Sequence, residues 1–135
     1  MEIAFGDFIS RKRTEKKITL MNMSRMLSIS PSYLADIEHG RRNPMDREKI
    51  LKLADILELS DKEREEMFDL AGKTRNEAPA DLSSYLVENP HVRYALRKAK
   101  SMGAGEDEWL QMVADLEKRT REKALRAKEE SAKRQ

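Results

Sequence analysis

The side chains best suited to bind another molecule lie in one stretch of the sequence, from Thr19 to Asn43. Within it, Ser32, Tyr33 and Asp36 fall outside the apolar positions of their predicted helix, so their polar groups are free to contact a ligand. No nucleophile with a neighbouring base and no phosphate-cradling glycine loop accompanies them, which predicts binding and not enzymatic chemistry.

Basic residues are concentrated in the same part of the chain. Between residues 11 and 43 there are eight Lys or Arg and three Asp or Glu, whereas residues 46–69 contain nine acids and five bases. A basic flank beside an acidic one orients a protein on a polyanion, because phosphates attract one and repel the other. The alternative interpretation is that these charged residues only keep the surface solvated, because 39% of the residues in the chain are charged.

Two short helices that meet across a tight turn must position these residues. Thr19 and Ser30 are suited to cap their N-termini, and Pro31 follows at the first helical position, where no N–H is needed. Apolar residues recur at spacings of three and four and predict one buried stripe on each helix. They are Met23, Met26, Leu27, Leu34 and Ile37.

Three further amphipathic helices are predicted around this pair. The first covers residues 3–13, a fourth is marked by the apolar positions between Ile50 and Leu57, and a fifth opens at Ser60 with a capping-box sequence and is expected to end at Gly72. The sequence thus predicts an all-α protein with a compact five-helix domain at residues 1–72.

A linker without periodicity is predicted at residues 73–80, followed by a helical C-terminal region at 81–117. Its last helix has Trp109, Met112, Val113 and Leu116 at helical spacing, which favours either a small local core or an interface with a second copy or another partner. Residues 118–135 are mostly charged, and we expect a frayed helix or a disordered tail there.

The stretch from Phe5 to Leu59 resembles the phage-repressor-like helix-turn-helix family, also named the XRE family. Phe5, Gly6, Ile9 and Arg13 are similar to its first helix, and residues 27–30 to its turn. The run from Ile37 to Pro44 resembles its I-E-x-G-x-x-x-P signature. Two positions depart from the family pattern, since Leu20 replaces a glutamine that touches phosphate and Ser28 replaces the turn glycine.

The resemblance implies a recognition helix that enters the major groove of double-stranded DNA. It places Pro31, Ser32, Tyr33 and Asp36 near base edges. Phosphate contacts are implied for a second set, Thr19, Ser30, His39, Arg41, Arg42 and Asn43. Alternatives remain at this stage: Asp36 as a surface acid paired with a nearby base, Tyr33 as a core residue, and the loop from Arg41 to Asn43 as ordinary solvated surface.

Arg13 and Glu38 align with a pair that forms an internal salt bridge between the first and third helices in this family. We therefore expect a structural role for both. Removing one partner would cost more than breaking an exposed pair, provided that the pair is buried.

These features predict a sequence-specific transcriptional regulator, a homodimeric repressor that binds an inverted-repeat operator. The alternative is an antitoxin-type autoregulator whose C-terminal region binds a toxin or another regulatory protein, or is recognised by a protease. The absence of cysteine, the two distant histidines and the absence of a long apolar run predict no metal, no cofactor and no membrane association, in a cytoplasmic protein.

Overall fold

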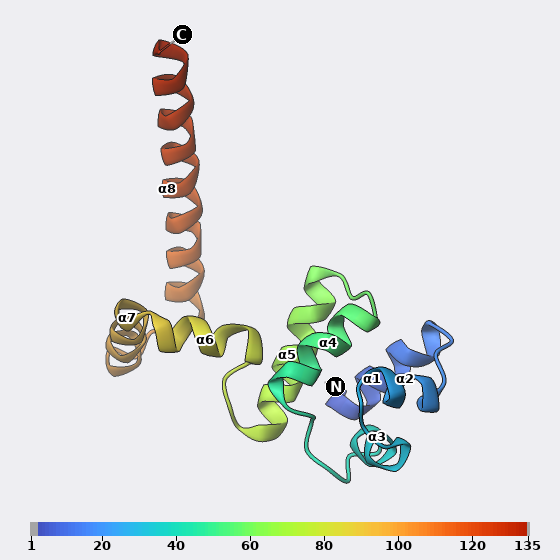
Figure 1. The fold of residues 1–135 in the computed structure, drawn as a ribbon. Coiled ribbons are helices and arrows are strands. Elements are labelled where there is room, and N and C mark those ends of the chain that lie inside the picture. Colours follow the sequence, from blue (N-terminus) through green and yellow to red (C-terminus); the bar gives the residue numbers. More distant parts are fainter. Residues whose placement is uncertain (1–2, 135) are drawn as a thin grey trace. The chain divides into compact units, whose positions relative to one another are not determined.

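A computed structural model describes residues 3–134, and over that range the chain is all-α, as the sequence predicts (Figure 1). The chain divides into two units between Glu88 and Asn89. The helices of the described part are α1 (Phe5–Glu15), α2 (Leu20–Met26), α3 (Pro31–Glu38), α4 (Arg47–Ile56), α5 (Asp61–Arg75), α6 (Ala80–Glu88), α7 (Pro90–Ser101) and α8 (Glu106–Lys133).

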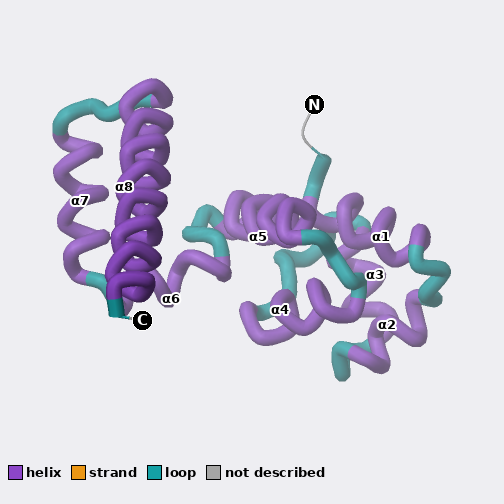
Figure 2. The backbone as a smooth tube through the Cα atoms, turned by 90° about the horizontal axis from the view of Figure 1, so that it is seen from above, coloured by secondary structure: helices purple, strands orange, loops and turns teal. Residues whose placement is uncertain are grey.

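Helices α1 to α5 lie together in the first unit (Figure 2). Their apolar stripes build its hydrophobic core, with Met45 added from the loop before α4. Most of these side chains are aliphatic, and their periodic spacing explains why the five helices could be placed from the sequence. The buried core residues are Phe5, Phe8, Ile9, Met23, Leu27, Leu34, Ile37, Met45, Ile50, Leu53, Ala54, Leu57, Met67, Phe68, Leu70 and Ala71.

Two predictions within this unit were wrong. Met26 is 42% exposed, because the buried face of α2 contains Met23 and Ser24 and turns Met26 outward. Helix α5 does not end at Gly72 but continues to Arg75, and Asn76 closes it in the left-handed conformation (φ 57°). The glycine is needed for space: a Cβ at position 72 would lie 2.8 Å from the carbonyl oxygen of Glu77, where the chain turns back over α5.

In the second unit, α8 is a continuous helix to Lys133, whereas we expected a frayed helix or a disordered tail at residues 118–135. Residues with high helix propensity explain its continuity, since Lys, Arg, Glu and Ala dominate the second half. Trp109, Met112, Val113 and Leu116 are 38% to 65% exposed, so they do not form a local core. Among the described residues from 89 onward, Ala99 alone is buried.

Candidate nucleic-acid interface

Local hydrogen bonds fix the start of both helices of the central pair. The Thr19 hydroxyl accepts a bond from the backbone N–H of Asn22 and the Ser30 hydroxyl accepts one from that of Tyr33, both at 3.1 Å. Pro31 and Ser32 are exposed at the first turn of α3, while Leu34 and Ile37 are buried on its other side. Helix α3 therefore presents its N-terminal outer face to solvent.

The tight turn between α2 and α3 forms even though Ser28 replaces the turn glycine of the family. Ser28 adopts the left-handed conformation (φ 57°), and the Ile29 N–H donates to the Ser24 carbonyl oxygen at 2.9 Å to close α2. Leu20, the other departure, is half-buried against the core. Its side chain offers no hydrogen bond to a phosphate.

Tyr33, Asp36, Arg41 and Arg42 form one cluster on this surface. Asp36 accepts a hydrogen bond from Arg41 Nη1 at 3.4 Å, and its second oxygen lies 3.6 Å from Arg42 Nε. The Arg42 guanidinium lies 5.3 Å from the centre of the Tyr33 ring, a cation–π distance. The structure thus joins four residues that the sequence analysis considered separately. It pairs Asp36 with two arginines, as the alternative interpretation of this residue anticipated.

Tyr33 is half-buried and packs against the core with part of its ring. Arg41 and Arg42 remain 68% and 59% exposed, so their guanidinium groups keep most of their hydrogen-bonding capacity for another partner. The cluster carries two positive charges and one negative charge. Its net charge attracts a phosphate, while Asp36 limits where the two arginines can point.

The remaining residues that are predicted to contact phosphate differ in their capacity to donate a hydrogen bond. His39 Nδ1 lies 2.7 Å from the Ala35 carbonyl oxygen, which fixes Nδ1 as the protonated nitrogen. In this tautomer the Nε2 atom is a hydrogen-bond acceptor. The Thr19 and Ser30 hydroxyls accept their capping bonds and still have a proton to donate, and Asn43 is exposed.

The loop that carries the two arginines is held by a residue that we placed in the linker. Arg75, at the end of α5, donates from Nη2 to the carbonyl oxygens of Pro44 and Met45, and both of these residues are buried. No local sequence signal identifies this contact, because the partners are about 30 positions apart. Arg75 therefore holds the loop of Arg41 and Arg42 in place, and the sequence analysis did not identify this role.

A buried brace connects α3 to α1. Arg13 donates from Nε and Nη2 to the two carboxylate oxygens of Glu38, each at 2.9 Å, and from Nη1 to the Ile18 carbonyl oxygen at 2.9 Å. Glu38 is 6% exposed, and its hydrogen bonds raise the pKa of Arg13 above the usual range. Gly6 allows the close approach of these helices, since a Cβ there would lie 2.5 Å from the Ile37 carbonyl oxygen.

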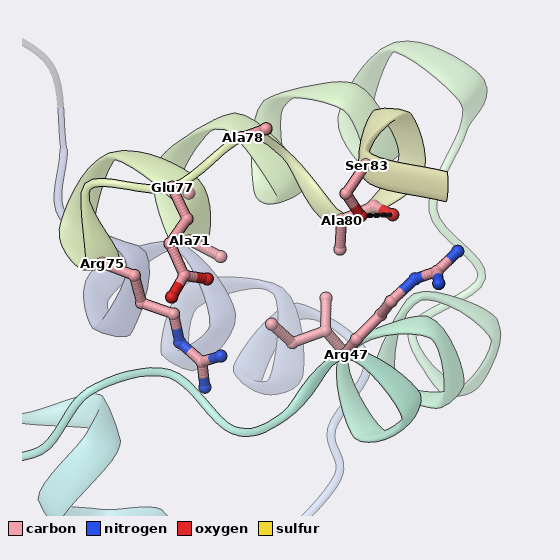
Figure 3. A pocket seen from close by; sticks show the side chains of 9 residues that line it. Arg47, Ala71, Arg75, Glu77, Ala78, Ala80 and Ser83 are labelled. Carbon is pink, nitrogen blue, oxygen red and sulfur yellow. Dashed lines mark hydrogen bonds between the residues drawn. The ribbon is translucent and has the colours of Figure 1, made fainter. Parts of the chain in front are cut away.

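A shallow pocket lies between α4, α5 and the start of α6 (Figure 3). Its charged lining residues are Arg47, Arg75 and Glu77, and the rest of the lining is mostly small, with Ala71, Ala78 and Ala80.

Within residues 3–134, no group of three His, Cys, Asp or Glu side chains could hold a metal ion. None of the helices in that range is long and apolar enough to cross a membrane.

Comparisons with known proteins concern mainly the first unit. The family of helix-turn-helix domains matches residues 4–67. No curated protein sequence matches the chain. A solved structure described as a SinR protein/SinI protein complex contains a chain with 16% sequence identity and a TM-score of 0.40, and the alignment covers 86% of this chain and 97% of the other.

Proposed function

We propose that the protein, whose residues 4–67 match a family of helix-turn-helix domains, is a sequence-specific DNA-binding transcriptional regulator that acts as a homodimeric repressor in the cytoplasm. One observation carries the proposal. The N-terminal outer face of α3 is exposed beside a fixed loop with two exposed arginines, and a buried ion pair anchors the same helix to the core. A rigid helix with basic edges fits the major groove.

In this proposal, the first turns of α3 face the bases. Ser32 donates to or accepts from several base edges, and Pro31 offers apolar contact. Asp36 accepts from a cytosine amino group, and the exposed edge of Tyr33 contacts the backbone or a thymine methyl group. Because Asp36 is already paired with two arginines, base reading by this carboxylate requires that at least one of them turn toward a phosphate.

Phosphate contacts hold the helix in register on either side of these bases. Arg41 and Arg42 supply the strongest of them, since hydrogen bonds between charged groups are roughly twice as strong as neutral ones. The amide N–H groups and hydroxyls at the two helix starts, at Thr19 and Ser30, add weaker contacts. Asn43 extends the same loop, and His39 lies just before it.

A homodimer allows two recognition helices to bind the two halves of an inverted repeat. The exposed apolar residues of α8 support this part of the proposal, because four large side chains at helical spacing favour a partner surface. They are Trp109, Met112, Val113 and Leu116.

Selection from a pool of random-sequence duplexes at moderate salt tests the proposal, and we expect one inverted-repeat sequence to be enriched. Replacing Arg41 and Arg42 together by Ala should weaken binding roughly ten- to hundredfold on every sequence and reduce the salt slope by about two. Ser32→Ala should instead change which sequence is enriched.

Arg64→Ala is a matched control, because Arg64 on α5 pairs with Asp55 on α4 at 3.0 Å, outside the α2–α3 surface. It should leave affinity and salt slope unchanged. A pool without any enriched sequence would refute sequence-specific binding.

A second candidate is an antitoxin-type autoregulator, which the same exposed C-terminal face favours. In that case the apolar residues of α8 bind a toxin or another regulatory protein. A small toxin-like gene beside its own gene, with a product that forms a stable complex with the full chain, would support this candidate. A stable homodimer that uses the same face would count against it.

A further inference from the structure

Helix α8 is long and has no covering partner among the described residues of the second unit. It has 28 residues, which corresponds to about 42 Å, and none of them is buried. Helix α7 lies beside only the first part of α8, which extends far beyond it (Figure 1). Isolated helices of ordinary composition are marginal in water, and this one exposes Trp109 and Leu116 in addition.

One uncharged stripe follows the whole length of α8. At 100° per residue, its seven positions fall within roughly 80° of the helix circumference. Large side chains occupy the first half of the stripe and small ones occupy the second half. The stripe consists of Trp109, Val113, Leu116, Thr120, Ala124, Ala127 and Ser131.

The charges of α8 are also separated along its length. Residues 106–117 contain five acids and no base. Residues 118–134 contain eight bases and three acids. The two halves therefore carry net charges of equal size and opposite sign, −5 and +5.

We infer that α8 pairs in antiparallel orientation with α8 of a second copy of this chain, around a two-fold axis at Thr120. In this register Trp109 faces Ser131 of the partner, Val113 faces Ala127 and Leu116 faces Ala124. Every large side chain meets a small one, and the acidic half of each helix lies along the basic half of the other.

The side-chain sizes along the stripe and the charges along α8 independently favour a second copy of α8 as the partner. Parallel pairing would place acid against acid and base against base, which is repulsive. An unrelated acidic or basic partner would complement only half of the helix. Only a reversed copy of α8 complements both halves in charge and in side-chain volume.

The inference rests on the homodimer of the proposed function and adds its surface and orientation. An antiparallel pair of identical helices has two-fold symmetry. This is the symmetry of an inverted repeat in DNA, whereas a head-to-tail arrangement would match a direct repeat.

Cross-linking tests the orientation cleanly, because the chain contains no cysteine. Full-length Val113→Cys and Ala127→Cys proteins are oxidised separately and as a mixture, and Thr120→Cys is oxidised alone. A disulfide needs Cα atoms within about 7 Å. In the antiparallel register the two copies of position 113 are 14 residues apart along the helix pair, about 21 Å.

We expect disulfide dimers from the Val113→Cys and Ala127→Cys mixture and from Thr120→Cys alone, and none from the other two variants alone. Cross-linking of Val113→Cys alone, without a mixed dimer that joins Val113→Cys to Ala127→Cys, would establish parallel pairing and overturn the inference. So would a sedimenting mass that stays at the 15.7 kDa of one chain at about 100 µM, well above the concentrations at which specific dimers form.

Two leucines provide a matched pair of variants. Leu116 on the stripe is 65% exposed and Leu125 on the opposite side of α8 is 59% exposed. We expect Leu116→Glu to weaken dimerisation at least tenfold and Leu125→Glu to leave it unchanged, with equal helix content by circular dichroism. Equal effects of the two would overturn the inference. None of these measurements uses DNA, so cross-linked dimers that enrich no duplex would refute only the proposed function.

Discussion

The pair of Arg13 and Glu38 gives the sharpest prediction about the helix-turn-helix domain. Replacing Arg13 by Met preserves much of the apolar stem of the side chain but removes the guanidinium. Glu38 then loses two hydrogen bonds of 2.9 Å, and the Ile18 carbonyl oxygen loses one. The carboxylate stays in place at 6% exposure, where water replaces these bonds poorly.

Breaking a buried ion pair by removing one partner costs about 3–5 kcal/mol. The lower end applies here because 16% of the Arg13 side chain is exposed, so some water can enter its place. We therefore expect the free energy of unfolding to fall by about 3 kcal/mol. With a slope of about 1 kcal/mol per M, the midpoint of urea unfolding moves down by about 3 M.

Urea unfolding followed by circular dichroism measures this loss, with Lys16→Met as the control. Lys16 also lies near the end of α1 and pairs with Glu58 at 3.0 Å, but the two side chains are 42% and 76% exposed. An exposed pair contributes about 0–1 kcal/mol. If both variants lost the same stability, burial would not be what makes the Arg13–Glu38 pair important, and the reasoning would be refuted.

Three other predictions use the same measurement. Gly6→Ala should lower the free energy of unfolding by about 2–3 kcal/mol, since the new Cβ would collide with the backbone of α3. A loss under about 0.5 kcal/mol would contradict this, because it would show that α1 and α3 separate easily. Ser28→Gly should raise it by about 0.5–1 kcal/mol, because glycine adopts the left-handed conformation without strain, and unchanged or lower stability would contradict this. Hydrogen bonds from Lys12 and Ser60 lower the pKa of Glu63 from 4.5 to about 2, so its contribution to stability is complete above pH 4.5 and disappears as the pH falls toward 2. The stability difference between the wild type and Glu63→Gln should shrink over that pH window, and a constant difference would rule out this titration.

Hydrogen bonds between close neighbours explain why much of the central helix pair was predictable. The caps at Thr19 and Ser30 join residues three positions apart, and Ser60 and Glu63 form a capping box over the same spacing. Such contacts depend on local sequence alone. The apolar stripes, with their period near 3.6, likewise identified most of the buried positions of α1 to α5.

Side-chain partners across the fold could not be found in this way. The bond from Arg75 to the loop at Pro44 and Met45, and the clash that reserves Gly72 for a glycine, depend on where the chain returns in space. The pairing of Asp36 with Arg41 and Arg42 depends on how the left-handed Gly40 redirects the loop. The sequence by itself determined where most helices begin and which sides of them are apolar, since both follow from local hydrogen bonding and periodicity. Only the tertiary structure decided which polar groups meet and that α8 stays uncovered within the described chain, because these outcomes depend on packing between distant segments.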